Sequence, residues 1–211
     1  LSHRKPSGVH AGLFPVEADP TKASRAVNRR AFSVKTANVS AHHSPIDAGT
    51  DMFEFIYLAI LIGMGGTALL DLWALLLKAV LGLPTPPWHL VGRWFAGMPK
   101  GQFVHRGGIG TSPPVPNELA IGWFMHYTVG VLFAAALLFI WGVQWAHGPT
   151  FLPALIVGLV TVGAGWFILQ PGMGVGVACN KAPQPTVARL QNVVGHIIFA
   201  IGMYGAARLL G

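Results

Sequence analysis

The chain has little charge and almost no cysteine. Only 10% of its 211 residues are Asp, Glu, Lys or Arg, and Cys179 is the single cysteine. A soluble domain of ordinary composition carries about 25% charged residues, so the low charge content favours a membrane protein. One cysteine excludes an internal disulfide bond and a CxxC metal site.

Acidic residues are the scarcest charged group, with 7 Asp and Glu against 14 Lys and Arg. The basic excess does not indicate a nucleic-acid partner. Seven of the basic residues lie in the first 51 positions, and the others flank long apolar stretches. A bilayer explains that distribution better, so we expect no nucleic acid among the partners.

No stretch alternates apolar and polar residues with period two, which argues against a transmembrane β-barrel. Long apolar runs are present instead, at residues 55–82, 119–143, 151–169 and 190–210. A helix needs ~20 residues to cross ~30 Å of hydrocarbon, and each run is about that long or longer. The sequence therefore predicts an all-α, polytopic membrane protein with a four-transmembrane-helix bundle in residues 52–211.

Residues 1–51 have a different composition from the rest. They are basic and poor in acid, with Ser and Ala between the basic residues, which is typical of an organelle transit peptide. The run Arg29-Arg30-Ala31-Phe32-Ser33 also resembles a mitochondrial processing site. We expect either a transit peptide or a basic docking tail, and whether it is cleaved stays open.

Loop charges predict an orientation. With four spans, residues 83–118 and 171–189 share one side of the bundle, here called the loop face, and most basic residues of the core lie there. The positive-inside rule places this face in the cytoplasm or matrix. The basic residues 1–51 would then lie on the other side, so the tail and the core charges conflict.

Aromatic and basic residues stand together in the Pro-rich segment 83–118, at Trp88, Arg93 and Trp94. Indole rings next to a basic side chain suit the headgroup layer of a bilayer. We predict that these residues contact lipid or a partner protein, and we expect bound phospholipid.

Polar residues interrupt the apolar runs at Asp71, His126 and His196, and Gln170 closes the third run. An ionisable side chain in hydrocarbon is costly and needs a partner. At 1.5 Å per residue, Asp71 lies about 16 Å from the loop face, His126 about 10 Å and His196 about 9 Å. The sequence thus predicts an intramembrane polar cluster of these residues with Gln170.

Three interpretations of this cluster stay open. It can be a structural hydrogen-bond network with no catalytic residue. His126 and His196 can be the axial ligands of a haem, or one of them can hold a chlorin. Alternatively, Asp71 and a histidine form a titrating pair for a proton, a quinone or a small molecule. Apart from a haem, no metal-binding motif is present.

A set of short motifs covers the chain from Gly63 onwards: Gly66-Thr67-Ala68, Asp71-Leu72-Trp73, Val91-Gly92-Arg93-Trp94, Gly122-Trp123, His126-Tyr127, Gln170-Pro171-Gly172-Met173-Gly174, and Arg189 with His196. Through them the chain resembles an uncharacterised bacterial family of small four-span inner-membrane proteins. The resemblance implies four helices and no assigned activity. The basic extension departs from the short bacterial N-terminus, which favours a eukaryotic organelle version.

We therefore expect a non-catalytic accessory subunit of a large energy-transducing complex, either of the respiratory chain or an ATP synthase. The expected location is the mitochondrial inner membrane, with a plastid or bacterial inner membrane as alternatives. Its partners would be other membrane subunits and lipids. The alternative function is an independent membrane carrier, or a haem- or quinone-binding redox protein, that uses Asp71, His126 and His196.

Overall fold

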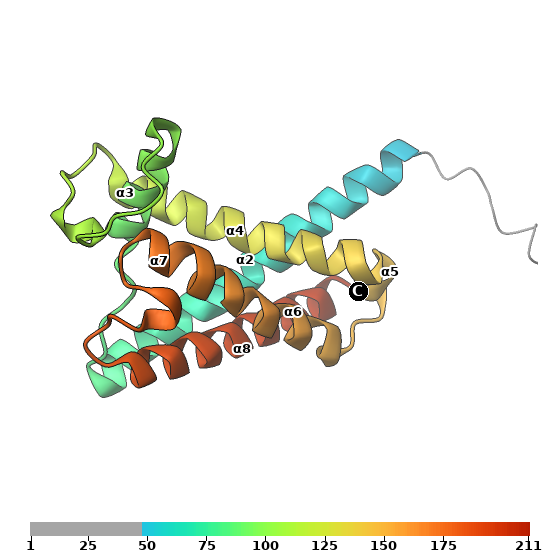
Figure 1. Cartoon of the computed structure of the whole chain (residues 1–211). Coiled ribbons are helices and arrows are strands. Elements are labelled where there is room, and N and C mark those ends of the chain that lie inside the picture. Colours follow the sequence, from blue (N-terminus) through green and yellow to red (C-terminus); the bar gives the residue numbers. More distant parts are fainter. Residues whose placement is uncertain (1–47) are drawn as a thin grey trace, which may run out of the picture. The chain divides into compact units, whose positions relative to one another are not determined.

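A computed structural model describes residues 48–211, whose elements are shown in Figure 1. Within this range the only regular secondary structure is helical. The α-helices are α2 (Ala48–Leu81), α3 (Trp88–Gly97), α4 (Glu118–Trp141), α5 (Gln144–His147), α6 (Phe151–Ala164), α7 (Gln170–Gly172) and α8 (Pro185–Leu210). Short 3-10 turns form η1 (Met98–Lys100), η2 (Ile109–Thr111) and η4 (Val177–Cys179), while η3 (Gly165–Leu169) is a π-helix that joins α6 to α7.

Four helical segments are long and apolar enough to cross a membrane: Asp51–Leu81, Glu118–Trp141, Phe151–Gly172 and Pro185–Leu210. This confirms the predicted all-α, multi-pass class by helix length and composition. Only 22–33% of the most apolar window of each helix is buried within the described chain. Most apolar side chains therefore face outward, as contact with lipid or with other membrane helices requires.

Glycine and proline set the ends of the long helices. Gly82 (φ 66°) follows α2 and Gly142 (φ 81°) follows α4, both in backbone conformations that glycine adopts without strain. Helix α8 begins at Pro185, ahead of the predicted start at residue 190, because proline is well accommodated in the first helical turn. The predicted extension and processing site lie outside the described residues, except that residues 48–51 form the first turn of α2.

Small residues let the long helices approach closely. Helix α2 packs against α4 and α8, and α6 packs against α8. A Cβ atom on Gly63 would lie 2.5 Å from Cα of Val131, and one on Gly202 would lie 2.7 Å from Cα of Gly66. Backbones this close exclude any side chain between them, as in other small-residue contacts of membrane helices. The core around these contacts includes Leu58, Ile62, Leu137, Phe199 and Met203.

The two long links pack on each other at the loop face. The N–H of His105 donates to the carbonyl of Gly172 (2.8 Å), and the N–H of Ile109 donates to that of Met173 (2.8 Å). The indole of Trp94 covers Gly172, where a Cβ atom would lie 2.5 Å from Nε1. These contacts fix the segment after α3 against the end of the third span. Figure 1 shows α3 and α7 at the same end of the bundle as the start of α4.

Candidate functional site

Asp71 of α2 is held by two consecutive residues of α4. Its Oδ1 lies 3.0 Å from Nε2 of His126, and its Oδ2 accepts a hydrogen bond from the hydroxyl of Tyr127 (3.0 Å). Where the carboxyl of Asp71 is ionised it only accepts hydrogen bonds, and Nε2 of His126 is then the donor. The side chains of His126 and Asp71 are 11% and 16% exposed. The structure thus joins two of the residues predicted to form a cluster and adds Tyr127.

Tryptophan side chains cover this contact. The ring of Trp88, at the start of α3, stacks on His126 with 3.9 Å between centroids and 26° between planes. Trp123 lies 5.5 Å from Trp88, 5.9 Å from His126 and 6.3 Å from Tyr127, centroid to centroid. Together Asp71, Trp88, Trp123, His126 and Tyr127 form what we call the α2–α4 cluster. Trp88 was predicted to contact lipid or a partner protein. It is half-buried, and its ring stacks on His126 of the same chain.

Gln170 and His196, the other residues predicted for the cluster, have no hydrogen bond to Asp71 in the described chain. Gln170 Nε2 donates instead to Oδ1 of Asn192 (2.6 Å), which also accepts from Nε1 of Trp166 (3.0 Å). Nε2 of His196 is buried and has no hydrogen-bond partner among the described residues, and the same holds for Oε1 of Gln170. Each oxygen of Asp71 contacts one side chain of α4, and neither contacts His196.

A haem between His126 and His196 would require a rearrangement. Ligation through Nε2 of His126 would break its contact with Asp71 Oδ1. Among the described residues, no three His, Cys, Asp or Glu side chains are grouped so that they could hold a metal ion.

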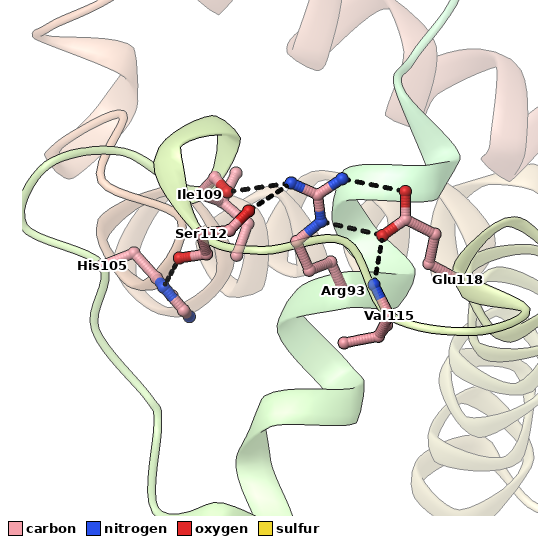
Figure 2. Close-up of polar contacts among 6 residues, drawn as sticks. All are labelled: Arg93, His105, Ile109, Ser112, Val115 and Glu118. Atoms are coloured by element: carbon pink, nitrogen blue, oxygen red, sulfur yellow. Dashed lines mark hydrogen bonds and ion pairs between the residues drawn. The ribbon is translucent and has the colours of Figure 1, made fainter.

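Arg93 of α3 is the centre of a second set of polar contacts, shown in Figure 2. Its Nε and Nη2 donate to the two carboxylate oxygens of Glu118 (2.8 and 2.9 Å), and its Nη1 donates to the carbonyls of Ser112 (2.8 Å) and Ile109 (3.5 Å). The N–H of Val115 also donates to Glu118 (3.1 Å). The hydrogen bond to Glu118 raises the pKa of Arg93 above its ordinary value. We call these contacts the Arg93 clamp.

Arg93 and Trp94 both point into the chain. They are 8% and 4% exposed, which leaves little surface for the lipid or partner contact predicted for them. Trp94 donates from Nε1 to the carbonyl of Phe103 (2.9 Å). Both side chains hold the backbone of the segment between α3 and α4 in place.

Cys179 has the environment of a structural thiol. It is 4% exposed, and its Sγ lies 3.9 Å from Oδ1 of Asn192. Burial raises the pKa of the thiol, and the charge of Arg189 opposes that effect. A buried thiol with a raised pKa is a poor nucleophile.

Sequence reasoning did not identify Tyr127, Glu118 or Asn192 as partners of the predicted residues. The sequence pattern could have indicated Asn192, because this residue precedes His196 by one helical turn and is polar within a mostly apolar helix. Tyr127 directly follows His126, but adjacent helix positions do not face the same way, so adjacency gave no reason to pair both with Asp71.

Four long apolar helices with polar contacts between them define a multi-pass helical membrane protein. The chain belongs to the family described as Protein of unknown function (DUF2938), whose model matches residues 60–210. The match includes Asp71, Arg93, His126 and His196, and it supports the resemblance to a family with no assigned activity. No curated protein and no solved structure matches the chain.

Proposed function

We propose that the chain is a non-catalytic accessory subunit of a larger assembly in an energy-transducing inner membrane. The main support is the outer surface of α2. This helix has 34 residues, which corresponds to a length of about 51 Å against ~30 Å of hydrocarbon. Beside the acidic Asp51 and Glu54, its N-terminal end carries apolar side chains that no other described residue covers, with Met52 61%, Phe53 74% and Ile56 48% exposed. An apolar surface of this kind marks a protein or membrane contact.

The α2–α4 cluster supports a structural role for the polar residues in the spans. Both oxygens of Asp71 are used by donors of the same chain, and the ring of Trp88 covers His126. Hydrogen bonds between membrane helices stabilise a bundle by ~0.6 kcal/mol on average. In the proposed role, the cluster holds α2 to α4.

We further propose the mitochondrial inner membrane as the location, and a respiratory-chain complex or an ATP synthase as the host. The chain would be the organelle version of a bacterial membrane protein. The basic, acid-poor composition of residues 1–51 and the run Arg29-Arg30-Ala31-Phe32-Ser33 support this proposal. Plastid and bacterial inner membranes are the alternatives.

Site-specific photo-crosslinking in the native membrane tests the proposed role. A photoreactive amino acid at Phe53 should crosslink to one or a few defined membrane subunits, and the product should migrate in a large complex on native gels. Phe139 of α4 is the matched control, because it is the same residue type and 83% exposed. It should crosslink mainly to lipid. If Phe53 also reaches only lipid and the protein migrates alone, the accessory role is refuted.

The second candidate is an independent carrier or a haem- or quinone-binding redox protein. One observation favours it: His126 and Tyr127 both contact Asp71 and lie beside the rings of Trp88 and Trp123, and such a polar group with aromatic neighbours suits a planar ligand. The absorption spectrum of the purified chain separates the two candidates. A Soret band that is lost in both His126→Ala and His196→Ala, or a quinone extracted in stoichiometric amount, would establish the second.

A further inference from the structure

A cavity of about 830 Å³ lies at the loop face, beside the start of the second span. Its wall is formed by the end of α3 with η1, by the segment 101–106 and by the segment 112–116. The last segment leads directly into the span that begins at Glu118. Figure 2 shows Arg93, His105, Ser112 and Val115, which belong to this wall. The cavity thus lies next to the N-terminal end of the second span.

The wall carries positive charge that the described chain does not neutralise. Lys100 and Arg106 line the cavity and form no ion pair with any described residue. Between residues 83 and 118 the only acidic residue is Glu118, and both of its oxygens are bound by Arg93. Two uncompensated cations on one concave wall attract an anion.

The wall is preformed. His105 Nδ1 lies 2.8 Å from the hydroxyl of Ser112, and the Arg93 clamp holds the carbonyl of the same serine. The N–H of His105 donates to Gly172, which ties the segment to the third span. Preorganisation of this kind reduces the entropy that a ligand loses on binding.

Part of the cavity's exposed rim is apolar. Phe103 and Val104 line it and are 55% and 63% exposed. Basic residues beside an apolar rim at the end of a span match a phospholipid, whose phosphate would meet the cations while its acyl chain follows the rim. A free phosphate ion has the same charge and acceptor oxygens, but it would leave the rim unused.

We propose that this cavity binds the phosphate group of an anionic phospholipid through Lys100 and Arg106. Arg93 is a positioning residue for the site, because its donors are used by Glu118 and by backbone carbonyls. The inference concerns a ligand of this chain and is independent of the proposed accessory role.

Native mass spectrometry of the full chain in detergent tests the proposal. The protein is incubated with phosphatidylglycerol or with phosphatidylcholine, and the retained lipid is measured. In the double variant Lys100→Gln/Arg106→Gln, affinity for phosphatidylglycerol should fall by about 25-fold, about fivefold for each cation near the headgroup. Lys181→Gln is the matched control, because this exposed lysine lies on the other link of the loop face. Its affinity should not change.

Equal retention of phosphatidylglycerol by the double variant and the unchanged chain would overturn the proposal, as would an equal loss in Lys181→Gln. The variant Lys100→Arg/Arg106→Lys keeps both charges and should keep binding, which shows that substitution at these two positions does not by itself abolish binding. Inorganic phosphate alone identifies the source of the anion. If it raises the thermal midpoint of the delipidated chain as much as phosphatidylglycerol does, the ligand is a soluble phosphate and the lipid assignment is wrong.

Discussion

Replacement of Asp71 distinguishes a structural role for the α2–α4 cluster from a role in proton transfer or ligand binding. Asp71 accepts from His126 and from Tyr127, at 3.0 Å in each case. In Asp71→Asn, the amide can still accept from Tyr127, and it can donate to Nε2 of His126 once the ring proton moves to Nδ1. In Asp71→Leu, neither contact can form, and two polar groups lose their partner.

The two contacts set the expected cost. Hydrogen bonds between membrane helices average ~0.6 kcal/mol and reach ~1.7 kcal/mol, so a pair contributes ~1.2–3.4 kcal/mol. The Asp71 side chain is 16% exposed, and partial access of water favours the lower part of that range. We expect Asp71→Leu to lower the free energy of unfolding by about 1–2 kcal/mol and Asp71→Asn by less than about 0.5 kcal/mol.

Equilibrium unfolding of the purified chain by SDS, followed by far-UV circular dichroism, measures both variants. A double-mutant cycle of Asp71→Leu with Tyr127→Phe should give a coupling energy of about 0.6 kcal/mol or more. The reasoning is refuted if Asp71→Asn costs as much as Asp71→Leu, since the charge and not the hydrogen bonds would then matter. If both variants keep full stability but the host assembly loses activity, Asp71 takes part in function and not in stability.

Three further outcomes follow from the packing and the loop contacts. Gly92→Ala should lower the free energy of unfolding by about 1–3 kcal/mol, because its Cβ would overlap the carbonyl of Glu118. Gly205→Ala, whose Cβ meets nothing within 4 Å, should not lower the free energy of unfolding in the same SDS titration. Arg93→Lys should lower the thermal midpoint measured by circular dichroism, since an ammonium group cannot bind both oxygens of Glu118 in the same way. Cys179 should react with iodoacetamide at least about tenfold more slowly in the folded chain than in SDS, measured by intact mass, because burial raises its pKa and limits access.

The fold class could be predicted because length and composition alone specify a membrane-spanning helix. A shared polar half of the bundle for Asp71 and His126 was predicted for a related reason, since each helix rises 1.5 Å per residue from a common face. The predicted depths differ by about 6 Å, yet the two side chains are in contact. The rotation of each helix about its own axis could not be predicted. Each residue turns the helix by about 100°, so equal depth does not make two side chains face each other. His196 illustrates the difference, because it was predicted at the depth of His126 yet makes no hydrogen bond to Asp71.

The loop contacts were the least predictable part of the candidate site. The composition of residues 83–118 indicates a membrane interface, and Arg93 and Trp94 carry that signal. Whether a guanidinium in such a segment points to lipid or into the chain depends on the path of the backbone, which proline and glycine set in an irregular segment. The partner Glu118 lies 25 residues further along the chain, and no local pattern connects it with Arg93.

Helix α3 connects the two sets of polar contacts. Its first residue, Trp88, stacks on His126 of the α2–α4 cluster, while Arg93, more than one turn later, is held by Glu118 at the start of α4. Gly92 and Gly122 let the backbones of α3 and α4 touch between these two points. A shift of α3 would therefore uncover the histidine ring and loosen the cavity wall together. The loop face and the histidine beside the intramembrane carboxylate thus contact the same short helix.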